Sequence, residues 1–277
     1  MITKPTNPIS GGLLLKDTPY NLYIAPHALL RPYISNYTVS FPERNMVSST
    51  LTLIPDASGT LSFAFDGSRI ISEYWGATTK TVDLGGEVNS YSMLLLVEFL
   101  PGGLYQLTGI PQTELADERL LLQSIDKALA VEICDVLEQA GSIEELAAML
   151  NTVFLSYMLH KEKQSMISQA AVQMIKNSYG QLTVKELSAS LHYSERHINR
   201  NLNECIGMSV KTFSRLVRIN NAVRRIQRPQ TSLLRVALES GFYDEAHFIN
   251  EFKTICGVSP DYYFKNMSDF YNETLKI

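Results

Sequence analysis

The chain has 277 residues, of which 45% are hydrophobic and 19% charged, a composition that excludes disordered and fibrous proteins. This length suffices for two domains, each with its own core. The cysteines Cys134, Cys205 and Cys256 form no C-x-x-C pair and leave one odd, which favours a reducing, cytoplasmic setting over a disulfide framework. No apolar run reaches about 18 residues and no signal-peptide core is visible, so we expect no membrane association.

The net charge of −4 conceals a division along the chain. Residues 1–160 contain 8 Lys and Arg against 17 Asp and Glu, whereas 161–277 contain 16 against 11. Within 185–235 there are 10 basic residues and 3 acidic ones. An acidic half joined to a basic half suggests one domain that avoids polyanions and one that binds them.

Short runs of β-branched and aromatic residues recur in the first hundred residues, separated by Pro-Asp, Asp-Gly and Gly-Gly turn signals. The predicted strands are 36–41, 48–54, 60–65, 69–75, 78–84 and 92–99. Evenly spaced short strands favour a barrel or a sandwich.

The pattern changes to helical spacing after residue 103. Apolar positions between Ile125 and Leu137 predict an amphipathic helix that stops at Gly141. Ser142 and Glu145 form a capping box for the next helix, whose apolar stripe covers 146–157. The stripe either packs on the strands or forms a dimer seam, and core packing is the favoured interpretation. The polar stretch 161–164 is the predicted boundary between a β-rich domain at 1–160 and an all-helical domain at 165–277, an α+β fold of two domains.

A repeat with a spacing of fifty residues lies in the helical half. The segment 194–202 aligns with 244–252, and Gly207 and Gly257 follow at equivalent positions. Each copy predicts a helix, a tight turn and a second helix capped by Ser194 or Asp244. The predicted units cover about 182–206 and 233–256, and a helix over 211–227 connects them. This is the helix-turn-helix arrangement, whose second helix enters a DNA major groove.

The residues of the second copy carry a family resemblance. The segment 236–242 (VALESGF), followed by Asp244, His247, Phe252, the run 257–260 (GVSP) and Tyr263, follows the signature of the AraC/XylS family of bacterial transcription regulators. Residues 165–265 therefore resemble that family's DNA-binding domain, which implies two recognition helices in successive major-groove segments. The segment 99–103 (FLPGG) is similar to a poorly characterised subgroup, which implies a sensor or dimerisation domain, often a cupin-like barrel, with no known ligand.

The chemistry of the recognition helices predicts which residues touch DNA. Arginine suits guanine and asparagine suits adenine in the major groove. The predicted base-reading residues are Arg196, Asn199, Arg200, Asn203 and Asn250. The predicted phosphate contacts are Lys185, Lys211, Arg215, Arg218 and Lys253. Family members more often carry arginine where Asn250 stands, so we expect the first unit to dominate sequence reading and the second chiefly to position the protein.

The first half offers no catalytic pattern. Residues 1–160 contain only His27 and His160, too few for a metal cupin, and no phosphate loop, GxSxG or HExxH motif occurs. We predict no enzyme activity, metal or cofactor. A small-molecule pocket is favoured over an active site in this half, with candidate residues Tyr23, Arg44, Tyr74, Trp75 and Glu98.

Two functions remain open for the whole chain. One is a DNA-binding regulator controlled by a small-molecule effector in its first half. The other is a regulator whose first half is a ligand-independent dimerisation or protein-interaction module. The expected partners are double-stranded DNA, a small-molecule effector, a second copy of the chain, and RNA polymerase if the protein is an activator.

Overall fold

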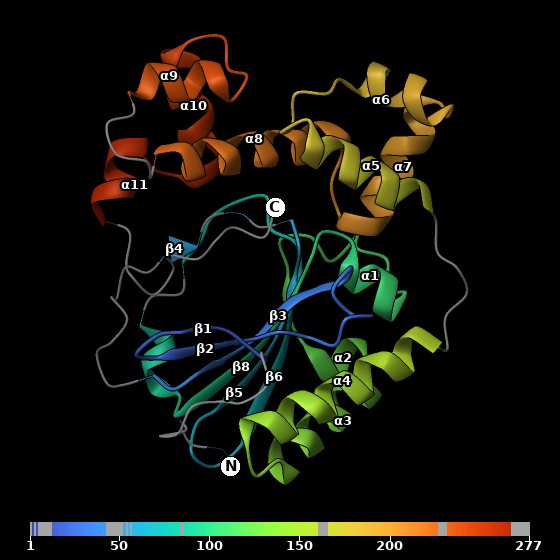
Figure 1. Ribbon diagram of the computed structural model, residues 1–277, viewed down its shortest axis with the longest axis vertical. Helices are drawn as coiled ribbons and strands as arrows, with labels where there is room; N and C mark the ends of the chain where they lie inside the picture. The colour runs from blue at the N-terminus through green and yellow to red at the C-terminus, as the bar shows by residue number, and fades with distance from the viewer. Residues whose placement is uncertain are drawn as a thin grey trace.

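The computed structural model describes residues 2, 4, 13–42, 52–53, 55, 57–83, 86–159, 166–226 and 232–266. Its N-terminal half is an antiparallel sheet followed by helices, and its C-terminal half contains helices and, within the described residues, no strand (Figure 1). The predicted α+β class with an all-helical second part is therefore confirmed.

Seven strands form the main sheet in the order β1-β2-β3-β8-β5-β6-β9. Their bounds are β1 (Leu14–Asp17), β2 (Asn21–Ile24), β3 (Ile34–Ser40), β5 (Thr60–Phe65), β6 (Ile70–Trp75), β8 (Met93–Phe99) and β9 (Arg119–Leu121). A separate two-stranded sheet pairs β4 (Thr52–Leu53) with β7 (Val82–Asp83). The sequence prediction missed β1, β2 and β9, and the predicted strand 48–54 lies largely outside the described residues.

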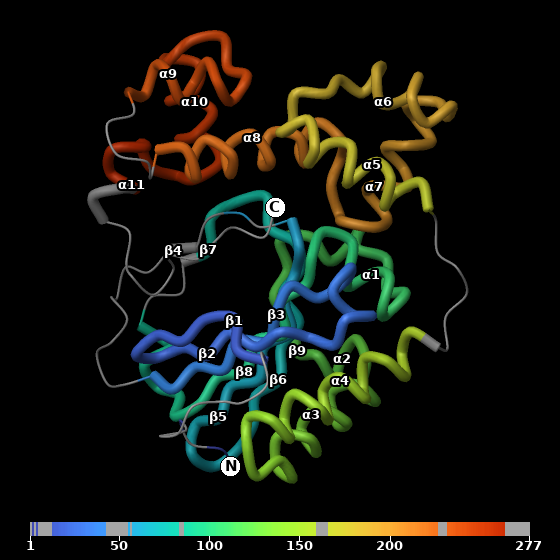
Figure 2. Tube along the Cα trace, viewed as in Figure 1, coloured from blue at the N-terminus to red at the C-terminus, as the bar shows by residue number. Residues whose placement is uncertain are grey.

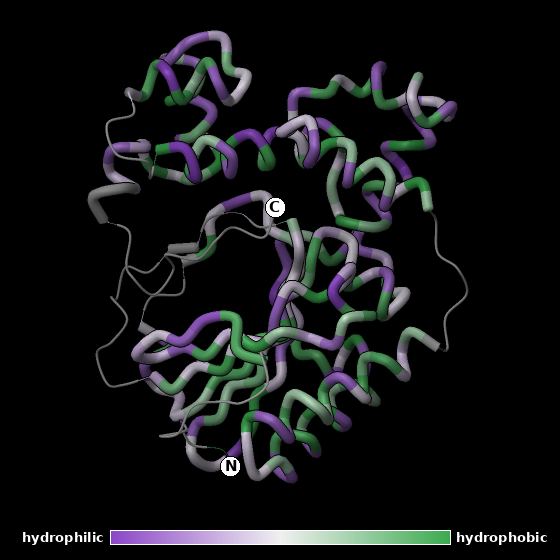
Figure 3. The backbone as a smooth tube through the Cα atoms, viewed as in Figure 1, coloured by the Kyte–Doolittle hydropathy of each residue, from purple (hydrophilic) through white to green (hydrophobic). Residues whose placement is uncertain are grey.

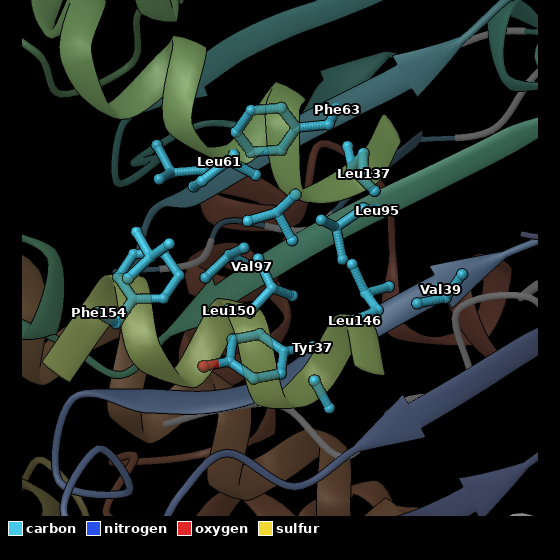
Figure 4. Packing of buried hydrophobic residues seen from close by; sticks show 14 of the residues in the cluster. Tyr37, Val39, Leu61, Phe63, Leu95, Val97, Leu137, Leu146, Leu150 and Phe154 are labelled. Carbon is cyan, nitrogen blue, oxygen red and sulfur yellow. The ribbon is translucent and has the colours of Figure 1, made fainter. Parts of the chain in front are cut away.

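One face of the main sheet packs against two long helices. These are α3 (Lys127–Gln139), which begins after its N-cap Asp126, and α4 (Ile143–Leu159), which begins after Ser142. Because side chains alternate along a strand, one set of strand residues points toward these helices. Figure 4 shows that set, Tyr37, Val39, Leu61, Phe63, Leu95 and Val97, packed against Leu137, Leu146, Leu150 and Phe154. The apolar stripe of α4 thus packs on the strands, as the favoured interpretation predicted.

The C-terminal half is built around one central helix. Its elements are α5 (Met166–Asn177), α6 (Val184–Leu191), α7 (Glu195–Ile206), α8 (Val210–Ile226), α9 (Leu233–Glu239), α10 (Glu245–Cys256) and α11 (Pro260–Asn266). Helix α8 runs between the group α5–α7 and the group α9–α11 (Figure 2). Apolar and polar residues alternate in short groups along these helices, as amphipathic helices require (Figure 3).

The two copies of the repeat fold alike and use the same kind of cap. Ser194 Oγ accepts a hydrogen bond from the His197 amide at 3.2 Å, and Asp244 Oδ1 accepts one from the His247 amide at 2.7 Å. Helix α6 begins with a complete capping box, with both reciprocal bonds between Thr183 and Glu186. These caps satisfy amide groups that a helix leaves free at its start.

The N-terminal half also contains, within its described residues, three short helical elements. They are α1 (Gly103–Thr108), α2 (Leu122–Ile125) and the 3-10 turn η1 (Glu87–Ser90). Helix α1 lies beside α7 (Figure 1). Two residues of the N-terminal half, Ala57 and Ala77, are buried within the C-terminal core rather than beneath the sheet. The halves are thus packed against each other and not merely tethered.

Candidate nucleic-acid interface

The first turns of recognition helix α7 present two arginines to solvent. Arg196 and Arg200 are exposed, whereas Ile198 and Leu202 on the opposite side are fully buried. Arg200 Nη2 lies 3.3 Å from His197 Nδ1, and the His197 ring stacks on Tyr193 with a centroid distance of 5.1 Å. The two arginines are therefore exposed on the side of α7 that is not buried in the core, and their contact with bases stays a prediction.

Asn199, predicted to read bases, also bonds within the unit. Its Oδ1 accepts a hydrogen bond from the Val210 amide at 3.1 Å, and its Nδ2 donates to the Glu195 carbonyl at 3.0 Å. Each polar atom of the amide thus makes one hydrogen bond inside the unit, which leaves one Nδ2 hydrogen and one Oδ1 lone pair for a further partner. The sequence places Asn199 on the first recognition helix, but it cannot show that the start of α8 lies against this side chain.

Asn203 also departs from the expected arrangement. It is half-buried, and its carbonyl accepts hydrogen bonds from the Gly207 amide at 2.8 Å and from Thr113 Oγ1 at 3.4 Å. Thr113 belongs to the N-terminal half, so Asn203 lies at the junction of the two halves rather than on the open face with Arg196.

The second recognition helix offers fewer polar groups. Asn250 and Lys253 of α10 are exposed, and Phe248 and Phe252 fill the core beneath them. Ala246, which corresponds to Arg196, brings no hydrogen-bonding side chain to this face. The exposed side of α10 therefore carries no arginine, whereas the exposed side of α7 carries Arg196 and Arg200.

Two of the five predicted phosphate-binding residues are used inside the protein. Arg215 forms a two-point ion pair with Glu251 of α10, with Nε–Oε2 at 2.7 Å and Nη2–Oε1 at 3.1 Å. Arg218 is half-buried, and its guanidinium lies 5.4 Å from the centre of the Phe242 ring. Burial lowers the pKa of Arg218, while the nearby Glu251 carboxylate opposes that shift. Both side chains are engaged within the protein because α8 faces the second unit at these positions, and the phosphate contacts assigned to them stay predictions.

The remaining predicted phosphate contacts, Lys185, Lys211 and Lys253, are exposed. A second ion pair, which was not predicted from the sequence, joins Arg225 Nη1 of α8 to Glu239 Oε2 of α9 at 2.6 Å. With the pair Arg215–Glu251, it fixes both helices of the second unit to α8. Helix α8 therefore sets the separation of the two units through specific contacts as well as through its length.

The face of the main sheet that is turned away from α3 and α4 carries a row of polar side chains beside apolar ones such as Leu94 and Leu96. Cross-strand pairing places Asn36, Glu98, Thr60 and Trp75 in one row across β3, β8, β5 and β6. Glu98 is only 3% exposed, and its Oε1 accepts hydrogen bonds from Thr38 Oγ1 and Asn36 Nδ2. Tyr23 lies in the adjoining row opposite Thr38. Three of the five proposed ligand-binding residues, Tyr23, Trp75 and Glu98, therefore share one face.

The other two proposed ligand-binding residues do not join them. Tyr74 is fully buried on the helix-covered face, opposite Leu61, and its hydroxyl donates to Gln112 Oε1. The prediction for Tyr74 is corrected because adjacent residues of a strand point to opposite faces. Arg44 lies outside the described residues.

Among the described residues, no group of three or more His, Cys, Asp or Glu side chains is arranged to hold a metal ion. Within the same segments, no helix is both long and apolar enough to cross a bilayer.

Comparison with known proteins places the helical half among DNA-binding proteins. A family described as a helix-turn-helix domain matches residues 187–266. An uncharacterised HTH-type transcriptional regulator of Haemophilus influenzae is 25% identical over 178 residues, which are 54% of this chain and 60% of that protein. The HTH-type transcriptional activator AarP of Providencia stuartii is 28% identical, over 46% of this chain and 95% of its own length. This chain thus spans less than two thirds of the Haemophilus relative.

Among solved structures, ToxT from Vibrio cholerae aligns with 80% of this chain and 97% of its own, with 13% identity and a TM-score of 0.45. The matched family segment begins at Leu187 in α6 and ends at Asn266, the last residue of α11. It therefore includes both recognition helices and the connecting helix α8.

Proposed function

Because this chain is a member of the AraC/XylS family of transcriptional regulators, we propose that residues 165–277 bind double-stranded DNA sequence-specifically through their two helix-turn-helix units. The observation that carries this proposal is the exposure of Arg196 and Arg200 on a recognition helix whose other side is fully buried. Arginine is the side chain best suited to contact guanine O6 and N7 in the major groove.

The two units have unequal tasks in this proposal. The first unit discriminates bases through Arg196 and Arg200. The second positions the protein, with Asn250 as its one predicted base contact. Lys185, Lys211 and Lys253 neutralise phosphates, because they are the predicted phosphate contacts that remain exposed. Helix α8 holds the units at a fixed spacing, which favours two successive segments of the groove.

The test compares DNA selected by the full chain from a random library with unselected DNA, in about 0.15 M salt. Arg200→Ala should relax the preference at one base pair by roughly 1–3 kcal/mol. Lys211→Ala should weaken binding to all sequences alike and reduce the salt dependence by about one phosphate contact. If wild-type protein shows no preference for selected DNA, the proposal is wrong.

We propose that the N-terminal half is a sensor whose small-molecule effector binds on the face of the main sheet that is turned away from α3 and α4. The support is Glu98, an almost fully buried carboxylate that accepts hydrogen bonds from Thr38 and Asn36. Trp75 lies on the same face in the same cross-strand row, with Thr60 of β5 between the two residues. Burying a carboxylate is costly unless it is well bonded, so retention of one on this face points to a binding role. The effector would donate hydrogen bonds to Glu98 and stack on Trp75.

The alternative is a first half that acts without a ligand, as a dimerisation or protein-interaction module. A thermal-shift screen of the full chain against a panel of metabolites separates the two. A compound that raises the unfolding temperature of wild-type protein but not of Trp75→Ala supports the sensor. No shift across the panel, together with concentration-dependent dimerisation, supports the module. In either case we place the protein in the bacterial cytoplasm, with RNA polymerase as its further partner if it activates transcription.

A further inference from the structure

The second half of recognition helix α7 is docked on the N-terminal half of the chain. The Glu204 carbonyl accepts a hydrogen bond from the Gln112 amide at 2.8 Å, and Glu204 Oε1 accepts one from the Tyr105 hydroxyl at 2.8 Å. Thr113 Oγ1 adds a bond to the Asn203 carbonyl at 3.4 Å. We call these bonds the α7 docking contact. They join the end of a DNA-reading helix to the sheet half through specific polar groups.

Gln112 is at the centre of the α7 docking contact. Its side chain is 3% exposed, donates from Nε2 to the Ile110 carbonyl at 2.7 Å, and accepts the Tyr74 hydroxyl bond at Oε1. Tyr74 belongs to β6, in the main sheet. One residue therefore connects a sheet strand, through its side chain, to recognition helix α7, through its backbone amide.

Two glycines allow the surfaces to approach this closely. A Cβ atom at Gly102 would lie 2.8 Å from Cys205 Sγ, and one at Gly207 would lie 2.8 Å from both Ala116 Cβ and the Gln112 carbonyl oxygen. Side-chain carbon atoms do not approach their neighbours so closely in well-packed proteins. The C-terminal end of α7 therefore packs closely against the N-terminal half, with no space for an added side chain at Gly102 or Gly207.

Docking affects the residues proposed to meet DNA. A cleft of about 650 Å³ lies between the halves, and its lining includes Arg200, Asn203 and Glu204 from α7 and Ile110, Thr113 and Glu114 from the N-terminal half. Glu114 thus places a carboxylate on the same cleft as a base-reading arginine. A DNA backbone entering beside Arg200 would be repelled by that charge, because like charges at short range destabilise an interface.

We propose that Gln112 is a positioning residue that holds the first recognition helix in a docked arrangement of low DNA affinity, and that loss of its bond to Tyr74 releases the helix. This inference rests on the proposed DNA-binding function. It identifies β6 as the strand through which a change in the sheet reaches α7.

The test measures the affinity of the full chain for library-selected DNA in wild type, Gln112→Ala and Tyr74→Phe. Tyr74→Phe keeps the buried ring and removes only the hydroxyl, so it is the milder change. We expect both variants to bind selected DNA about three- to tenfold more tightly, since one hydrogen bond contributes a factor of that order. Tyr91→Phe is the matched control, because its hydroxyl bonds Glu87 away from the docking contact. A damaged fold would lower affinity, so a gain cannot be produced by misfolding.

A second readout needs no DNA. Cys205 is 1% exposed beneath the docking contact, and burial raises the pKa of its thiol to about 11, so an alkylating reagent reaches it only when the contact opens. Cys256 is 2% exposed in the second unit and serves as the reference within the same molecule. Peptide mass spectrometry should show faster alkylation of Cys205 in Gln112→Ala and Tyr74→Phe, with Cys256 unchanged.

The outcomes separate this inference from the proposed function. Tighter DNA binding with faster Cys205 alkylation supports the inference. Unchanged or weaker DNA binding in both variants, or a gain in affinity without faster Cys205 alkylation, overturns it while leaving the DNA-binding function intact. If wild type and all variants lack any preference for selected DNA, the proposed function fails and the inference fails with it.

Discussion

The two glycines that end the recognition helices provide a matched pair of substitutions, Gly207→Ala and Gly257→Ala. Both residues occupy the left-handed region, with φ of 72° and 71°, and both close the last turn of their helix. A Cβ atom at Gly257 would come no closer than 3.4 Å to Thr81 Oγ1, which is an ordinary contact. A Cβ atom at Gly207 would meet Ala116 and the Gln112 carbonyl at 2.8 Å.

The magnitudes follow from these distances. Each alanine pays about 1–2 kcal/mol for the left-handed backbone. At Gly207 the clash involves backbone and a methyl group that cannot rotate away, so overpacking adds about 1–3 kcal/mol. We therefore expect Gly207→Ala to lower the free energy of unfolding by about 2–5 kcal/mol. Gly257→Ala should lower it by about 1–2 kcal/mol.

Urea unfolding followed by far-ultraviolet circular dichroism measures both variants against wild type, with Trp75 fluorescence reporting the sheet half separately. The slopes of the transitions must agree with wild type for the free energies to be compared. Equal destabilisation by the two substitutions would refute the reasoning, because it would mean that the end of α7 is not seated against residues 112–116.

Three further predictions concern single contacts. Thr183→Ala removes the capping box of α6 and should lower the free energy of unfolding by about 1 kcal/mol, measured by urea titration. Glu251→Gln breaks the two-point ion pair with Arg215 and should cost about 1.5–3 kcal/mol in the same assay, whereas an unchanged midpoint would show that the pair does not hold α10. Hydrogen bonds from Arg119 lower the pKa of Glu87, so its stabilising effect is complete above about pH 5 and is lost as the pH falls through that lowered value. The stability difference between wild type and Glu87→Gln should therefore shrink between pH 6 and pH 3, and a constant difference would contradict this.

The elements that could be predicted are those with a strong local signal. Strand β5 matches the predicted 60–65, and the capping box at Thr183 and Glu186 marks the start of α6 within two residues of the predicted unit. Repeated caps and glycines located both recognition helices because these features depend on neighbours only three or four residues away. Strands β1, β2 and β9 escaped prediction because three or four residues are too few to show alternation.

Of the candidate site, the sequence could predict only which residues lie on the exposed side of a helix. The sequence identifies the buried and exposed sides of α7, so the exposed positions of Arg196 and Arg200 agree with it. It cannot show what a second element does to an exposed-looking residue. Asn199 bonds to α8, Arg215 bonds to α10, and Gln112 bonds to both β6 and α7. Each of these contacts joins residues that no helical or strand period relates to each other.

The most direct test of the central claim is selection of DNA from a random library by the full chain and by Arg196→Ala and Arg200→Ala. We expect wild-type protein to enrich a site with two parts about one helical turn apart, roughly 10 base pairs. Its stronger part should lose base preference at one position in each variant. No enriched site with wild-type protein, or an enriched site that both variants select equally well, would contradict the account.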